Sequence, residues 1–148
     1  MSHIGQQIEF SSTAFPPCAE DNELVNHETM HGYALARYIA DSLPRHDFAL
    51  ARTVAEDWGW WCEVENDGFT LAYACGTQGS EEDFEPDSKP RDRRVADDFV
   101  LFVIPDKPQI RRWFKKIDVA DRVEALNQAI FSILAESGKA TKGPVWVS

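Results

Sequence analysis

One stretch decides the fold of this chain: residues 60–75 read WWCEVENDGFTLAYAC. Asp67–Gly68 stands between two runs of residues with high β-propensity, and Asp-Gly favours a type I′ turn, in which both central residues have positive φ. A two-residue loop at this point places Val64 opposite Leu71 and sets the pairing of all other residues in the two runs. The stretch therefore predicts an antiparallel β-hairpin with a defined register.

Side chains alternate between the two faces of this hairpin, because successive residues of a strand point to opposite sides. One face is apolar and aromatic and consists of Trp60, Cys62, Val64, Phe69, Leu71, Tyr73 and Cys75. The other face mixes large, charged and small side chains, namely Trp61, Glu63, Glu65, Thr70, Ala72 and Ala74. The alternation predicts that the first face lies in the core, whereas burial of the second depends on what covers it.

Four further segments have the pattern of strands. Phe48, Leu50 and Val54 lie two or four residues apart, which is strand spacing, although Arg52 interrupts this apolar face. Residues 6–10 alternate weakly, which predicts a strand at the edge of the sheet. Residues 99–104, FVLFVI, form an unbroken apolar run that predicts a central strand covered on both faces. Residues 144–147, PVWV, predict a short final strand.

Two segments have apolar residues at intervals of three and four, the spacing that places side chains on one face of a helix. The first helix is expected within about Asn22–Leu43, because the proline that follows disfavours helical angles at the residue before it. The second is expected over about Val119–Ser137, and Gly138 suits the left-handed position after its last turn. Together the segments predict an α+β protein, a two-layer sandwich of a three- to five-stranded, mostly antiparallel sheet packed with two helices.

Composition limits both the number of domains and the classes of partner. The chain has 148 residues, of which 43% are hydrophobic, and these values predict one packed domain over residues 1–148. The 25 acidic residues against 15 basic ones give a formal charge of −10. That charge argues against binding to nucleic acid and favours a basic partner, and the sequence leaves the oligomeric state open.

Localisation is predicted from the N-terminal residues and the cysteines. The sequence has no run of the roughly 18–20 apolar residues that a membrane span needs, and residues 1–7 lack the pattern of a secretion signal. Cys18, Cys62 and Cys75 include no closely spaced pair, so they make a poor disulfide framework. These features predict a cytoplasmic protein without membrane contact.

Tryptophans and acidic residues around the start of the hairpin form the leading candidate for a functional site. The set consists of Trp58, Trp61, Glu63 and Glu65, and the acidic segment 81–87 would extend it. Large aromatic area combined with negative charge is typical of surfaces that bind cationic groups. The leading hypothesis is a non-enzymatic domain that binds a basic protein, as an immunity protein or an inhibitor does, and that needs no cofactor.

A second hypothesis depends on residues 27–31, HETMH, which match the pattern H-E-x-x-H. On a helix, residues four apart share one face, so His27 and His31 can bind one Zn²⁺ while Glu28 acts as general base. The segment resembles the motif of the zincin metallopeptidases over these five residues. The alternative function is therefore a small zinc-dependent hydrolase.

The rest of the zincin motif is incomplete. Arg37 stands where the longer form has a third histidine, so a third ligand would be a downstream acid such as Glu56. On the expected helix, His27 and His31 flank the apolar stripe and do not face the core. This placement equally predicts a pair of partly exposed histidines that bind no metal.

Residues Gly32–Ala36, followed by Glu56-Asp57-Trp58-Gly59-Trp60 and the hairpin, resemble a group of small bacterial proteins without an assigned activity. The likeness covers Gly32–Cys75 and the general order of helix, hairpin, strand and helix. It implies a compact α+β fold and supplies no activity, cofactor or catalytic residue. Residues 27–31 lie outside the part that carries the likeness.

Overall fold

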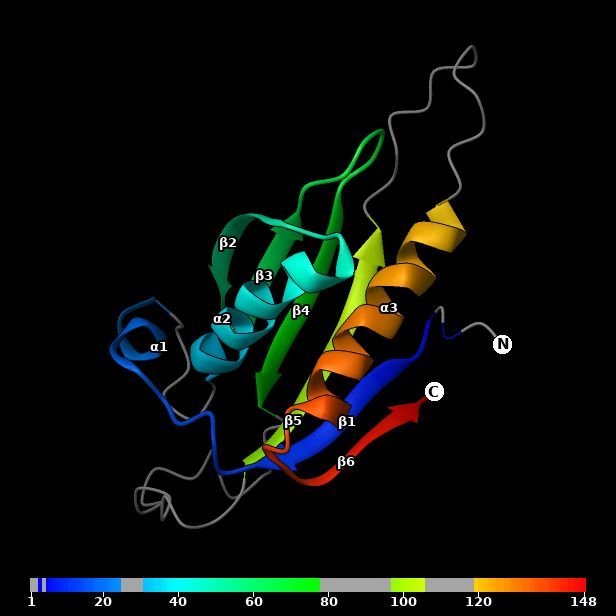
Figure 1. Cartoon of the computed structure of the whole chain (residues 1–148). Coiled ribbons are helices and arrows are strands. Elements are labelled where there is room, and N and C mark those ends of the chain that lie inside the picture. The colour runs from blue at the N-terminus through cyan, green and yellow to red at the C-terminus, as the bar shows by residue number, and fades with distance from the viewer. Residues whose placement is uncertain (1–2, 4, 25–30, 78–96, 106–118) are drawn as a thin grey trace.

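The computed structural model of the chain describes residues 3, 5–24, 31–77, 97–105 and 119–148 (Figure 1). In chain order, its elements are β1 (Gln7–Ser12), α1 (Ala19–Leu24), α2 (Tyr33–Ser42), the 3-10 helix η1 (Leu43–His46), β2 (Leu50–Glu56), β3 (Gly59–Val64), β4 (Leu71–Thr77), β5 (Asp97–Pro105), α3 (Val119–Glu136) and β6 (Ala140–Val147). These elements confirm the α+β class.

The described strands form one antiparallel sheet in the order β2–β3–β4–β5–β1–β6. Its six strands exceed the predicted three to five. The expectation of an edge strand near residues 6–10 is wrong, because β1 lies between β5 and β6 and pairs with both. The last strand, β6, takes the edge position, and a local pattern of apolar residues cannot indicate so distant a pairing.

Helices α2 and α3 lie on the same face of the sheet, as Figure 1 shows, and their apolar sides pack on the core residues of the strands. We call this side of the sheet the helix face and the opposite side the outer face. The largest fully buried side chains come from both layers: Tyr73, Phe99, Ile8, Leu35, Ile39, Leu43, Leu71, Leu101, Leu126, Ile130, Ile133 and Leu134. The core of the described chain therefore lies between the helices and the helix face.

The hairpin of residues 60–75 has the predicted register. Val64 pairs with Leu71, and Cys62 pairs with Tyr73. Every residue of its apolar face is buried, with no more than 8% of any of them exposed. Alternation and a short connection were therefore sufficient to predict both the pairing and the buried face.

The turn of this hairpin differs from the prediction. Gly68 has a φ of 88°, but Asp67 does not have the positive φ that a type I′ turn requires. The connection is closed instead by Asn66, whose Nδ2 donates a hydrogen bond to the carbonyl oxygen of Phe69 at 3.1 Å. The register was right although the predicted turn type was wrong.

Strand β5 alternates in burial, so the expectation that residues 99–104 are covered on both faces is wrong. Phe99 and Leu101 point to the helix face and are fully buried, whereas Val100 and Phe102 are only partly buried on the outer face. The apolar run is unbroken because the outer face is itself partly apolar.

The first predicted helix is interrupted, whereas the second is confirmed. Residues His31 and Gly32 are not helical, so the expected helix within 22–43 is replaced by α1 and α2. The chain passes very close to β4 here, since a Cβ on Gly32 would lie 3.0 Å from the carbonyl oxygen of Cys75. Helix α3 ends one residue before the predicted end, and Gly138 has a φ of 70° as expected.

Candidate functional site

The outer face carries most of the aromatic and acidic residues that the sequence marks as a contact surface. Two rows of side chains cross it from β2 to β5: Val54, Trp61, Ala74 and Phe102 in one, and Arg52, Glu63, Ala72 and Ile104 in the other. The helices α2 and α3 pack on the other side of the sheet (Figure 1). Neither of these helices covers the rows, although Ala72 and Ala74 at their centre are fully buried.

The two tryptophans of the predicted surface both lie on this face but are held differently. Trp58, in the turn between β2 and β3, is 37% exposed, and its ring centroid lies 6.2 Å from that of Phe102. Trp61 is partly buried, and its Nε1 donates a hydrogen bond to Oε1 of Glu63 at 3.1 Å. Trp58 is thus the more accessible of the two aromatic anchors.

The two acidic residues of the predicted surface, Glu63 and Glu65, differ in their exposure and in their hydrogen bonds. Arg52 donates from Nε and Nη2 to the two carboxylate oxygens of Glu63, at 2.8 and 2.9 Å. These bonds lower the pKa of the Glu63 carboxyl below its ordinary value, against the opposing effect of burial. Glu65 is exposed beyond the paired part of β3, and the segment 81–87 lies outside the described residues. Glu65 is therefore better suited than Glu63 to a charge on another molecule.

The β2–β3 hairpin is strongly acidic. Residues 50–65 contain four acidic side chains and one basic side chain, Arg52, which is a net charge of −3. Arg52, the basic residue among them, is paired with Glu63. A surface with this excess of negative charge attracts cations.

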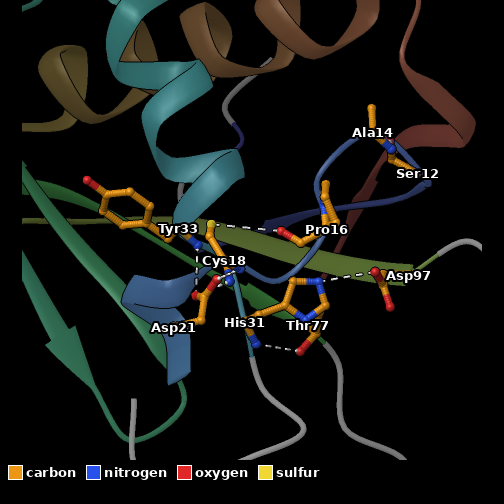
Figure 2. A network of polar contacts seen from close by, with 10 residues as sticks. Ser12, Ala14, Pro16, Cys18, Asp21, His31, Tyr33, Thr77 and Asp97 are labelled. Atoms are coloured by element: carbon orange, nitrogen blue, oxygen red, sulfur yellow. Dashed lines mark hydrogen bonds and ion pairs between the residues drawn. The ribbon is translucent and has the colours of Figure 1, made fainter. Parts of the chain in front are cut away.

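His31, the second histidine of the predicted zinc motif, lies in a separate buried polar site (Figure 2). Its Nε2 lies 3.1 Å from Oδ2 of Asp97, and its ring packs edge-on against Phe99. Its backbone N–H donates to the hydroxyl of Thr77 at 3.3 Å, and its carbonyl accepts from the Thr77 N–H at 3.0 Å. Because only 5% of His31 is exposed, the expectation of a partly exposed side chain is wrong for this histidine.

The helix that the zinc hypothesis assumes is not formed at His31. This residue precedes α2, and His27 and Glu28 lie outside the described residues. Within the described ranges, no group of three or more His, Cys, Asp and Glu side chains is arranged to hold a metal ion. Zinc binding by His27 and His31 therefore stays a prediction.

Asp21 organises the region next to His31, and sequence reasoning missed it. Its Oδ1 accepts hydrogen bonds from the N–H groups of Gly32 and Tyr33, at 2.9 and 3.0 Å, and its Oδ2 accepts one from the Cys18 N–H at 3.0 Å. The indole Nε1 of Trp60 adds a fourth at 2.7 Å. Asp21 is 2% exposed, so these donors compensate a buried carboxylate. No local motif marks it, because the donors lie up to 39 positions away.

Two cysteines near these residues are not activated as nucleophiles. Burial, followed by the charge of Asp21, raises the pKa of the Cys18 thiol to about 11. The pKa of Cys75 is raised first by its hydrogen bond with Cys62 and then by complete burial. A reactive cysteine requires the opposite shift, toward the thiolate. The two thiols therefore fit packing better than catalysis.

Comparisons of the chain with models of protein families, with curated proteins and with solved structures gave no match. Among the helices of the described residues, none is both long and apolar enough to cross a lipid bilayer.

Proposed function

We propose that this chain is a non-enzymatic binding domain that covers a basic surface of another protein with the outer face of its sheet. Trp58 and Trp61 supply aromatic contact area, and Glu65 supplies accessible negative charge. Glu63 acts indirectly, because it orients Arg52 and the indole of Trp61. The role expected for such a domain is that of an inhibitor or an immunity protein.

The exposed apolar side chains are the observation that carries this proposal. Over the described ranges, the large hydrophobic residues that are exposed are Trp58, at 37%, and Val145, at 53%. Trp58 packs on Phe102, an outer-face residue, and Val145 pairs with Glu9 on the same face. An exposed tryptophan beside a second aromatic ring is typical of the anchor residues of protein interfaces.

Charge favours a basic partner for this face. The chain has a formal charge of −10, and the β2–β3 hairpin alone contributes −3. A phosphate backbone would be repelled, whereas a cationic protein surface would be attracted over distances of about 10 Å at 0.1 M salt. Strands that are roughly 4.8 Å apart make a six-stranded face about 24 Å wide, which suits a protein surface better than a small molecule.

The test is association of the captured partner with charge and aromatic variants. The partner is captured from native lysate at low salt on immobilised wild-type protein, identified and purified. Glu65→Lys should then slow association several-fold, because it replaces an attractive charge by a repulsive one. Trp58→Ala should weaken the complex by about tenfold or more. Glu136→Lys, on the exposed end of α3, is the matched control and should leave the association rate nearly unchanged.

Two results would overturn the proposal. Equal slowing by Glu136→Lys and Glu65→Lys would mean that only the net charge matters, and unchanged binding of both Trp58→Ala and Glu65→Lys would exclude the outer face. Elemental analysis tests the alternative function independently. One equivalent of zinc in the wild-type protein, lost in His27→Ala, would favour the zinc-dependent hydrolase.

A further inference from the structure

The sheet ends in two edge strands that differ in regularity. Among the described strands, β2 pairs with β3 alone, and β6 pairs with β1 alone (Figure 1). The pairing of β6 shifts twice, and Pro144 within it has no N–H to donate. Irregular pairing and proline both discourage an edge from pairing with another chain. Residues 52–56 of β2 have neither feature, so β2 is the edge that favours a further strand.

Helix α1 contacts β2 but does not use its backbone. The Asp21 carboxylate of α1 accepts a hydrogen bond from the indole of Trp60, whose side chain points to the helix face. Within the described ranges, no backbone hydrogen bond joins α1 to β2. An added strand would lie in the plane of the sheet, about 4.8 Å beyond β2, where it would meet these backbone groups.

The register with β3 shows which backbone groups of β2 point outward. Glu56 pairs with the first residue of β3 across a two-residue turn, so these two residues exchange both of their hydrogen bonds. Hydrogen-bonded pairs alternate along an antiparallel ladder, so Val54 also directs its backbone groups to β3. The N–H and C=O groups of Thr53 and Ala55 consequently point away from the sheet.

These outward groups match those of a second copy of β2 in antiparallel orientation. A two-fold axis at Val54 places Thr53 of each copy opposite Ala55 of the other. Each of these opposite pairs can exchange two hydrogen bonds, because both residues direct their backbone groups to the other copy. The edge of β2 is thus complementary to itself.

Charge selects this axis among those that the backbone allows. With the axis at Val54, Arg52 of each copy lies directly opposite Glu56 of the other, on the outer face. An axis at Thr53 or at Ala55 would also match the outward groups, but it would place both charged side chains opposite uncharged residues. Opposite charges that face each other across two strands favour the pairing.

Both charged side chains can make this contact and keep their present ones. Arg52 uses Nε and Nη2 for Glu63 and its side chain is 66% exposed, so Nη1 can donate to a second carboxylate. Within the described ranges, no hydrogen bond or ion pair engages the carboxylate of Glu56. Strand β2 has one basic and one acidic residue, so it is neutral in a chain whose formal charge is −10. The edge itself therefore adds no net repulsion between two acidic chains.

We propose that this protein forms a two-fold dimer in which the β2 strands of two copies pair antiparallel about Val54. The two sheets become continuous, and both outer faces lie on the same side of the joined sheet, because opposite residues of paired strands share a face. The dimer goes beyond the proposed function and does not require it, since no contact with a basic partner enters the argument.

The oligomeric state of the intact chain is the first test. Sedimentation equilibrium over roughly 10 µM–1 mM should show a reversible dimer with a Kd on the order of 100 µM, because a contact between two edges is small. Glu56→Arg should raise the Kd by about tenfold, since two attractive pairs become repulsive. Ala55→Pro, which removes an outward N–H, should raise it by at least about tenfold. Glu136→Arg, the same change of charge on the exposed end of α3, is the control and should alter it by less than about twofold.

A cross-link tests the register of the dimer. Val54→Cys places two thiols at the axis, where opposite residues have Cα atoms about 4.5 Å apart, within the range of a disulfide. Oxidised glutathione should therefore link two copies of this variant. Ala51→Cys is the matched control, because its two thiols would lie about 20 Å apart along the strands. The wild-type protein, with its own three cysteines, gives the background.

Three results would overturn the dimer. The first is a monomer over the whole range of concentration. The second is a dimer whose Kd neither Glu56→Arg nor Ala55→Pro changes, which would assign the contact to another surface. The third is equal cross-linking of Ala51→Cys and Val54→Cys, which would exclude a pairing about Val54. Circular dichroism of each variant verifies that the fold is retained, and the cross-link decides the question if Ala55→Pro does not fold.

Discussion

The two faces of the sheet are built by the same strands but differ in burial. On β5, Leu101 is fully buried against the helices, whereas its neighbour Phe102 is only partly buried on the outer face. Burial of a large apolar side chain stabilises a fold by about 1.5–3 kcal/mol, so the helix face contributes most of the stability. Partly buried residues of the outer face, such as Phe102, contribute less to stability. Under the proposed function, the period of two along each strand separates the residues that stabilise the fold from those that contact the partner.

The largest expected effect lies in the helix layer, at Asp21. Asp21→Ala leaves four N–H donors without their acceptor, namely those of Cys18, Gly32, Tyr33 and the Trp60 indole, so we expect a loss of about 3–5 kcal/mol in the free energy of unfolding. Urea denaturation measures it. Asp41→Ala, which removes an exposed carboxylate paired with Arg37, is the control and should cost under about 1 kcal/mol. Equal losses in the two variants would mean that the hydrogen bonds to Asp21 stabilise the fold no more than an exposed ion pair does.

A matched pair on β5 tests the comparison of the two faces most directly. Leu101→Ala should lower the free energy of unfolding by about 2–5 kcal/mol, because it opens a cavity in the core. Phe102→Ala should cost about 1–2 kcal/mol, because a partly buried ring loses less apolar area. Thermal and urea unfolding measure both. If Phe102→Ala costs as much as Leu101→Ala, the outer face belongs to the core and the comparison fails.

The turn that presents Trp58 depends on a glycine. Gly59 has a φ of 151°, and a Cβ there would lie 2.4 Å from the carbonyl oxygen of Cys75. Gly138→Ala, where φ is also positive but nothing lies within 4 Å, provides the control for backbone conformation alone. We expect Gly59→Ala to cost about 1–3 kcal/mol more than Gly138→Ala, because β4 must move. Similar costs for the two variants would show that β4 moves away from a side chain at position 59 without loss of stability.

The smallest effect is a pH dependence on the outer face. The bonds from Arg52 lower the folded-state pKa of Glu63 below the ordinary value of 4.5. The stabilisation from this pair is therefore present above about pH 4.5 and is lost as the pH falls through the folded-state pKa. Urea midpoints of the wild-type protein and Arg52→Gln should differ at pH 6 and converge near pH 3. Arg45→Gln should show no such convergence, and a wild-type advantage that persists at low pH would contradict the assignment.

Local patterns predicted those parts of the fold that local interactions determine. The hairpin of residues 60–75 and helix α3 follow from alternation and from three-and-four spacing, and both were confirmed. The interruption before α2 was missed because it depends on contact of Gly32 with β4, more than 40 positions away. The internal position of β1 was missed for the same reason, since its partners come from the other half of the chain.

The candidate site was predictable to a similar extent. Alternation assigned Trp61 and Glu63 to the second face of the hairpin, where the register has them. Alternation did not indicate that Arg52 pairs with Glu63, because this pair depends on the irregular register between β2 and β3.

The position of β1 has a consequence for synthesis. On the ribosome the first strand emerges early, yet both strands that flank it, β5 and β6, are translated only after residue 96. Until then the nascent chain can complete only the β2–β3–β4 meander, and its N-terminal strand has no neighbour to pair with. The sheet therefore cannot be completed before β6 is synthesised, and chains that stall before β6 should expose an unpaired edge of β1 to chaperones and proteases.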